Sequence, residues 1–238
     1  LGKVGFQQSY TYFTWRNTKA ELEAYLSELA HQTADQFRPN LWVNTPDILT
    51  EYLQFGGEAG HKIRAVVAAM AGASWGMYAG FELIESVARP GAEEHIDSEK
   101  YEYKPRNWDA AEKAGKSIAP FITKLNQIRA AHPAVRQLRN LELHSSDDAS
   151  ILVFSKHLAA EHSPTGKAET VIVVVNVDPH SVRETSVHLD LWRAGIAGNN
   201  FEVRDLLTDE TYEWSANNYV RLDPRDNPAH VLLVTKVL

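Results

Sequence analysis

The chain has 238 residues, of which 44% are hydrophobic and 23% charged, and this composition is typical of a globular protein with one large domain or two small ones. The net charge of −7, with both signs interspersed, argues against nucleic acid as a partner, and the absence of cysteine excludes disulfides and thiolate zinc sites. No apolar run reaches transmembrane length and no signal peptide opens the chain, so we expect no membrane partner. A cysteine-free chain suits a reducing cytosol, and we expect a cytoplasmic location.

Residues 1–136 alternate between strand and helix patterns. Residues 9–15, rich in aromatic and β-branched side chains, and the apolar run 41–43 read as strands, and 74–79 reads as a third. A capping box at Thr18 to Glu21 predicts a helix after the first strand, and Thr45-Pro46 is expected to open a helix after the second, interrupted at Gly56-Gly57. Residue 1 is Leu and strand-like residues follow almost at once, so we expect that the chain begins inside a longer protein.

A loop is predicted over 86–106, followed by a long helix from about Trp108 to Ala131. Pro120 should kink this helix or break it into two. Three strand–helix units do not close a parallel barrel, which takes roughly 250 residues. Residues 1–136 are therefore either an open three-layer fold or the last portion of a barrel.

Residues 137–238 show a different pattern, with short strands separated by turns and no helix. This spacing predicts an antiparallel β-sandwich, with the domain boundary near 134–139. The expected fold class is thus α/β plus all-β. The strands are expected at 141–143, 150–157, 170–175, 185–189, 201–205, 219–222 and 231–237.

The end of the strand at 41–43 carries the most informative motif. The run stops at Asn44, Thr45 and Pro46, and Asp47 then presents a carboxylate, as catalytic residues do at strand ends of β/α barrels. The alternative is that Asp47 lies in the first turn of a helix and complements its dipole, with Thr45 as the N-cap.

Five motifs occur in order and together resemble the α-amylase superfamily, glycoside hydrolase family 13. They match most closely the maltosyltransferases that extend α-1,4-glucan from α-maltose 1-phosphate. Pro46 stands where an ordinary amylase usually has His, which favours this branch. The motifs lie at 8–16, 43–47, 75–82, 97–101 and 125–133.

The resemblance implies that the chain is the C-terminal third of such an enzyme: about strands six to eight of a (β/α)8 TIM barrel in 1–136, then the β-sandwich in 137–238. The enzyme would be a retaining glycosyltransferase, commonly a homodimer, without cofactor or metal. Its nucleophile and general acid would come from barrel strands four and five, so residues 1–238 alone would be inactive.

The same resemblance assigns roles to particular residues. Asp47 would stabilise the transition state by hydrogen bonding to sugar hydroxyls, and Asn44 would shape the pocket beside it. Lys100 and Tyr101 would bind the leaving phosphate of the donor, although acidic neighbours also allow a solvated loop with no such role. Tyr10, Tyr12 and Trp15 lie on a strand that could line a sugar cleft, but alternation would direct only some of them inward, and we expect packing in the core instead.

Two other functions stay open. One is another reaction of the superfamily, such as hydrolysis or isomerisation to trehalose. The other is a non-catalytic glucan-binding module made of a degenerate half-barrel and a sandwich.

Overall fold

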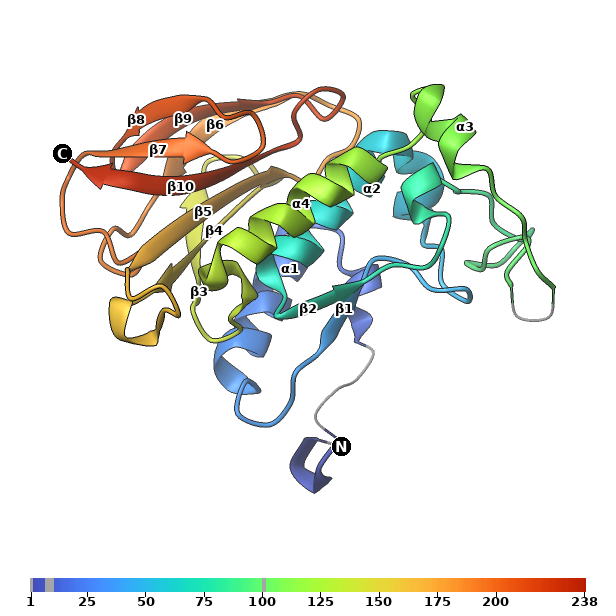
Figure 1. Ribbon diagram of the computed structural model, residues 1–238, viewed down its shortest axis with the longest axis horizontal. Helices are drawn as coiled ribbons and strands as arrows, with labels where there is room; N and C mark the ends of the chain where they lie inside the picture. The colour runs from blue at the N-terminus through green and yellow to red at the C-terminus, as the bar shows by residue number, and fades with distance from the viewer. Residues whose placement is uncertain (1, 7–10, 100–101) are drawn as a thin grey trace.

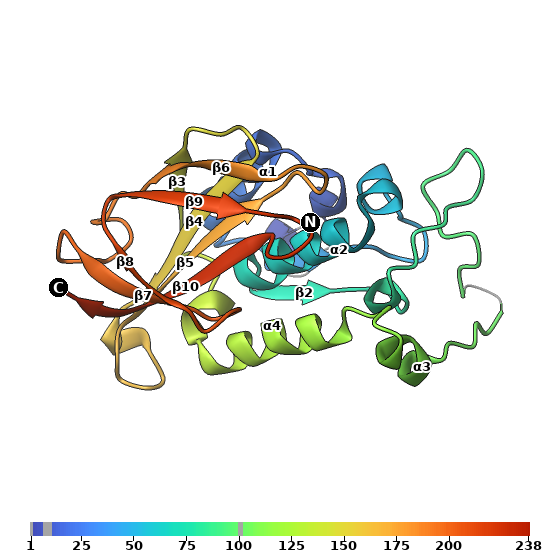
Figure 2. The ribbon, with the colours of Figure 1, turned by 90° about the horizontal axis from the view of Figure 1, so that it is seen from above.

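The computed structural model describes residues 2–6, 11–99 and 102–238. Helices and two short parallel strands make up the N-terminal part, and an antiparallel sheet makes up the rest (Figure 1). The loop that leads to α3 projects from the end of the molecule opposite the C-terminus, as Figures 1 and 2 agree. Within the described residues, no helix is both long and apolar enough to cross a bilayer.

The N-terminal part contains few regular elements besides its helices. Its helical segments are η1 (Gly2–Val4), η2 (Tyr12–Trp15), α1 (Lys19–Ser27), η3 (Glu28–Gln32), α2 (Glu51–Ala71), η4 (Phe81–Leu83), α3 (Trp108–Lys113), α4 (Ala119–Ala131) and η5 (Pro133–Arg136). Its strands β1 (Asn40–Trp42) and β2 (Ser74–Gly76) pair in parallel, with Leu41 opposite Trp75.

Local sequence signals explain where several of these helices begin and end. The capping box predicted before α1 is present, because the Thr18 hydroxyl accepts the Glu21 amide and the Glu21 carboxylate accepts the Thr18 amide at 3.0 Å. Gly57, with φ of 56°, interrupts α2 as expected. The long helix predicted over 108–131 is broken into α3 and α4, and Pro120 lies in the first turn of α4.

Two predictions for this part were wrong. Residues 7–10 lie outside the described residues, and Tyr12–Trp15 of the expected first strand form a 3₁₀ turn. The helix expected at Thr45-Pro46 begins only at Glu51, because Thr45 and Ile48 instead close a tight turn with reciprocal backbone hydrogen bonds of 3.1 Å. Thr45 is therefore not a helix N-cap, and Asp47 does not lie in a helical turn.

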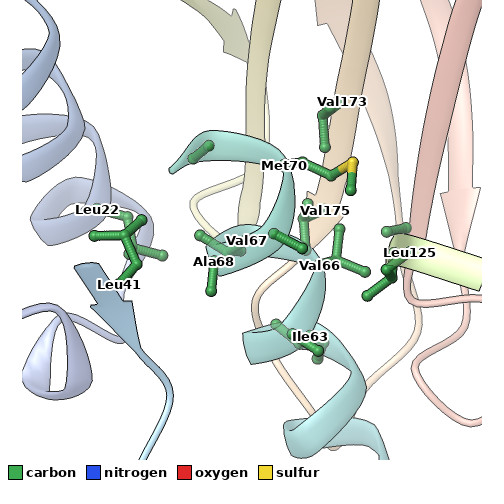
Figure 3. Close-up of a cluster of buried hydrophobic side chains, with 14 of the residues drawn as sticks. Leu22, Leu41, Ile63, Val66, Val67, Ala68, Met70, Leu125, Val173 and Val175 are labelled. Carbon is green, nitrogen blue, oxygen red and sulfur yellow. The ribbon is translucent and has the colours of Figure 1, made fainter. Parts of the chain in front are cut away.

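Helix α2 lies at the centre of the molecule. Every residue from Ala65 to Ala71 is buried, so the end of the helix is apolar on all sides. A helix of this kind must be enclosed by other elements. Figure 3 shows that Val66 and Met70 approach Val173 and Val175 of the sheet, while Ala68 faces Leu22 and Leu41.

The C-terminal part is an eight-stranded sheet in which all neighbouring strands are antiparallel, in the order β8-β7-β10-β5-β4-β3-β6-β9. All seven predicted strands are confirmed, and β8 was missed. The strands are β3 (Leu141–Ser146), β4 (Ile151–Leu158), β5 (Glu169–Asn176), β6 (Arg183–His188), β7 (Phe201–Asp205), β8 (Thr211–Trp214), β9 (Asn217–Leu222) and β10 (Ala229–Val237), with the 3₁₀ turn η6 (Ala160–His162) between β4 and β5.

The two faces of this sheet bury two different cores. Alternate residues such as Phe154 and Val173 pack against the helices, while Val153 and Ile172 point into a second cluster. That second cluster also contains Val220 of β9 and Phe201 of β7, so the curled sheet packs its two halves face to face (Figure 2). The expected β-rich domain is thus present, built from one continuous sheet.

A buried lysine joins the two parts of the chain. The Lys156 ammonium, on β4, donates to the carbonyl oxygens of Ala71 (2.9 Å), Val135 (3.0 Å) and Gln137 (2.5 Å). These carbonyls belong to the end of α2 and to the segment of η5. The apolar core of the helices is also continuous with the sheet across residues 136–137, and the domain division at that point stays a prediction.

Candidate active site

The turn after β1 presents the carboxylate to which the sequence pointed. Asp47 is exposed on the turn closed by Thr45 and Ile48. The alternative role, complementing a helix dipole from a first helical turn, does not apply because α2 begins four residues later. The predicted catalytic role of Asp47 stays a prediction.

Asn44 is fully buried and ties the end of β1 to its surroundings. Its Oδ1 accepts the Tyr78 backbone amide at 2.9 Å, so its Nδ2 is the atom that donates to His95 Nε2 at 3.1 Å. Burial lowers the pKa of His95 to about 4, which keeps the ring neutral and leaves Nε2 able to accept this bond. Asn44 therefore fixes the strand ends and the His95 loop relative to one another.

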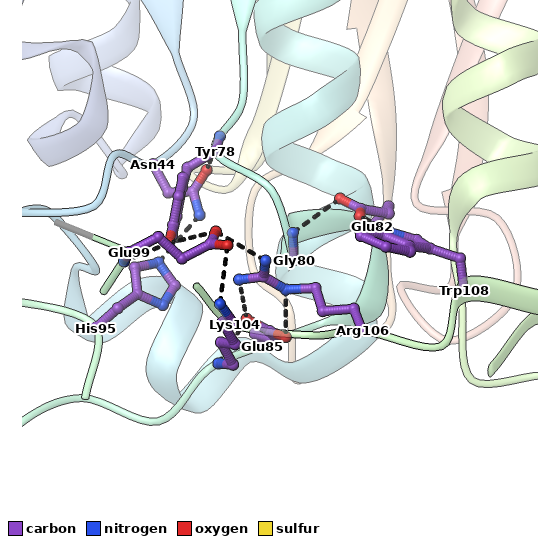
Figure 4. A network of polar contacts seen from close by, with 10 residues as sticks. All are labelled: Asn44, Tyr78, Gly80, Glu82, Glu85, His95, Glu99, Lys104, Arg106 and Trp108. Carbon is purple, nitrogen blue, oxygen red and sulfur yellow. Dashed lines mark hydrogen bonds and ion pairs between the residues drawn. The ribbon is translucent and has the colours of Figure 1, made fainter. Parts of the chain in front are cut away.

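Tyr78 continues this network outward from β2 (Figure 4). Its hydroxyl donates to Glu99 Oε2 at 2.9 Å and accepts the Glu99 backbone amide at 3.0 Å. The other carboxylate oxygen of Glu99 accepts the Lys104 amide at 3.3 Å. Glu99 is thus held by Tyr78 on one side and by the Lys104 backbone on the other.

Arg106 connects Glu99 to a second carboxylate. Its NH1 donates to Glu99 at 2.8 Å, and its Nε and NH2 donate to the two oxygens of Glu85 at 2.8 and 3.1 Å. Lys104 adds an ion pair to Glu85 at 3.0 Å. Such a bidentate guanidinium–carboxylate pair is both strong and directional.

The charges in this network compensate one another, with two carboxylates against two cations. Burial alone would raise the pKa of Glu85, but hydrogen bonds from Arg106 and Lys104 bring it below its ordinary value. Hydrogen bonds from Arg106 and Tyr78 likewise lower the pKa of Glu99. Both carboxylates are therefore ionised at neutral pH and committed to internal partners.

Lys100 and Tyr101, the predicted phosphate-binding residues, lie outside the described residues. Their role stays a prediction. Their neighbour Glu99 does not face solvent as a free charge, because Arg106 and Tyr78 engage it. The alternative of a solvated loop surrounded by Asp97, Glu99 and Glu102 also stays open, since Asp97 and Glu102 are exposed.

Glu82 supports the same region from η4. Its carboxylate accepts the Trp108 indole N–H and the Gly80 amide, the latter at 3.1 Å. Gly80 has φ of 96°, and a Cβ there would lie 2.2 Å from a Glu85 carboxylate oxygen. Only glycine fits at this position beside the network.

Sequence reasoning missed the roles of His95, Glu85 and Arg106. Glu99 is 7 residues from Arg106, but the other partners are 19 to 51 residues away along the chain, where no local spacing identifies them. The only available signal was the density of charged residues in the loop 86–106. Among the described residues, no group of three or more His, Asp or Glu side chains could hold a metal ion.

Sequence comparisons place the chain in a known family. A family model described as "GLGE, C-terminal" matches residues 143–234. An alpha-1,4-glucan:maltose-1-phosphate maltosyltransferase of Streptomyces coelicolor is 49% identical over 99% of this chain, and one of Arcanobacterium haemolyticum is 49% identical over all of it. The chain belongs to this maltosyltransferase family. It spans about a third of the length of these relatives, 34% and 35% respectively.

Solved structures extend the likeness to the amylase fold. An alpha-amylase of Geobacillus thermoleovorans, complexed with acarbose, superposes with a TM-score of 0.64 over 98% of this chain and 49% of that one, at 14% identity. An Anoxybacillus alpha-amylase gives 0.62 at 13% identity, covering 98% of this chain and 48% of the amylase. The maltosyltransferase segment therefore shares the arrangement of helices and sheet found in these amylases.

Proposed function

We propose that the full-length protein transfers maltosyl from α-maltose 1-phosphate to the non-reducing end of an α-1,4-glucan and releases phosphate. The observation that carries the proposal is the 49% identity along the entire chain to proteins named for this activity. We further propose that β1 and β2, which are parallel, are strands of a (β/α)8 barrel completed by residues that precede this segment.

In this proposal the segment supplies one side of a retaining reaction. A carboxylate nucleophile and a carboxylic acid from the preceding part of the barrel would break the C1–O bond of the donor and form a glycosyl ester. The acceptor 4-hydroxyl would then attack C1 and displace the ester, giving its proton to the acid–base residue. Phosphate would leave in the first step with the C1 oxygen.

Asp47 would act on the sugar ring during both steps. A carboxylate accepts hydrogen bonds from ring hydroxyls more strongly as positive charge develops on the ring. Asn44, fully buried behind the same strand end, would hold the turn in place through Tyr78 and His95. Lys100 and Tyr101 would bind the departing phosphate, which carries about two negative charges. Lys100 would contribute an ammonium group and Tyr101 a phenol hydroxyl.

The test uses the full-length protein with maltose 1-phosphate and glycogen, and measures inorganic phosphate. We expect phosphate release that depends on both substrates, and an Asp47→Asn variant slower in kcat by about 10²- to 10³-fold. Asp35→Asn is the matched control, because Asp35 is also an exposed turn residue but precedes β1 instead of following it. No phosphate release by the wild type, with glucan binding retained, would instead support a non-catalytic module.

The proposal extends to a cytoplasmic homodimer, as the family resemblance implies. Light scattering of the full-length protein tests the stoichiometry. A monomer at micromolar concentration would contradict it.

A further inference from the structure

The turn η2 presents two aromatic rings to the outside of the molecule. The side chains of Tyr12 and Trp15 are 69% and 37% exposed, whereas Phe13 between them is fully buried. The two outer rings lie 5.8 Å apart between centroids, tilted by 49°. The expected core packing is therefore wrong for Tyr12 and Trp15, while Tyr10 lies outside the described residues. The two described rings form one exposed aromatic surface on this segment.

A buried arginine enforces this arrangement. Arg64 of α2 is 2% exposed, and its NH2 and NH1 donate to the carbonyl oxygens of Phe13 and Arg16, each at 2.6 Å. The guanidinium also lies 4.0 Å from the centroid of the Phe13 ring. Burying a guanidinium is costly, and here both bonds fix the backbone of a four-residue turn. The backbone of the turn is therefore held on α2, with Phe13 facing inward.

Glu93 ties the aromatic surface to the segment that follows Asp47. Its carboxylate accepts the Trp15 indole N–H at 3.0 Å, and its other oxygen accepts the Glu51 amide at 3.4 Å. Its carbonyl accepts the Leu49 amide at 2.6 Å, and η2 itself packs against β1. The Trp15 indole is therefore joined through Glu93 to residues 49 and 51, directly after the turn that carries Asp47.

A partly exposed aromatic ring suits the apolar C–H face of a glucose unit, and the Trp15 indole N–H already has an acceptor in Glu93. The reacting donor needs an enclosed pocket, whereas an open platform suits a chain that continues into solvent. We propose that Tyr12 and Trp15 bind the α-1,4-linked acceptor glucan by stacking. The inference deepens the proposed function and rests on it for the name of the acceptor.

The test compares acceptor and donor kinetics in the full-length enzyme. In Trp15→Ala and in Tyr12→Ala we expect the KM for maltohexaose to rise about tenfold or more, a loss that stacking of one ring can account for. The KM for maltose 1-phosphate and kcat at saturating acceptor should stay within about twofold. Trp15→Phe should recover most of the acceptor affinity, because it keeps an aromatic face. Trp192→Ala is the matched control, since Trp192 is 87% exposed in the distant sheet part of the chain.

A second measurement separates this inference from the proposed reaction. Titration of maltohexaose without donor should change the tryptophan fluorescence of the wild type, and the change should be lost in Trp15→Ala. If the wild type releases no phosphate but shows this fluorescence change, the proposed reaction is wrong and glucan binding by the aromatic surface is supported. An unchanged acceptor KM in both alanine variants, or equal rises in donor and acceptor KM, would overturn the proposal that Tyr12 and Trp15 bind the acceptor.

Discussion

His61 lies fully buried in α2, and its two ring nitrogens have different surroundings. Nδ1 donates to the Gly57 carbonyl at 2.7 Å, while Nε2 has no hydrogen-bond partner among the described residues. A proton on Nε2 would therefore be buried without an acceptor. Burial lowers the pKa of His61 to about 4, from an ordinary value of 6.5.

This shift predicts a loss of stability in mild acid. Below pH 6.5 the unfolded chain takes up a proton that the folded chain binds only near pH 4, so the free energy of unfolding falls as pH falls through this window. We expect His61 to account for about 2 kcal/mol of the fall between pH 7 and pH 5. Urea unfolding of the wild type and of His61→Gln at both pH values measures it. Equal pH dependence in the two proteins would contradict the prediction.

At the scale of elements, α2 packs against β5 and so joins the helices to the sheet. Val173 is fully buried on the helix-facing side of β5, near Met70 (Figure 3). We expect Val173→Ala to lower the free energy of unfolding by about 2 kcal/mol, because it removes two buried methyl groups and leaves a cavity. The matched control is Val237→Ala at the 47% exposed end of β10, which should change stability by less than about 0.5 kcal/mol. Equal effects in urea unfolding would contradict the assigned core.

Elements with a local signature were predictable from the sequence, and those decided by distant contacts were not. Capping at Thr18, the break at Pro120 and the alternating strands all depend on near neighbours. The turn at Tyr12–Trp15 reads as a strand by composition, but hydrogen bonds from Arg64, about 50 residues away, fix it as a 3₁₀ turn.

The same rule applies to the candidate site. Asn44 and Asp47 follow a strand that could be recognised locally, whereas the Glu85–Arg106–Glu99 network forms only when the loop folds back on itself.

At the scale of the whole molecule, one apolar core runs from α1 through α2 into β5 and β10. Lys156 adds polar contacts at the same junction, since its ammonium satisfies three carbonyls from the ends of helical segments. Burial holds the pKa of Lys156 well below its ordinary value. A side chain this costly to bury is retained where several chain segments must meet in one arrangement.

We therefore expect the chain to unfold in a single transition, and we expect Lys156 to stabilise both the helical part and the sheet. Far-UV circular dichroism reports on all helices and strands, and tryptophan fluorescence reports on Trp42 and Trp75 in one part and Trp214 in the other, so the two urea midpoints should coincide. Lys156→Met should lower both midpoints together, by about 2 to 3 kcal/mol of unfolding free energy, because three buried carbonyls lose their donor while the cost of the buried charge is removed. Lys167→Met, at an exposed site, should leave both unchanged. Separate midpoints for the two probes would mean that the helical part and the sheet are independent folding units despite their shared core.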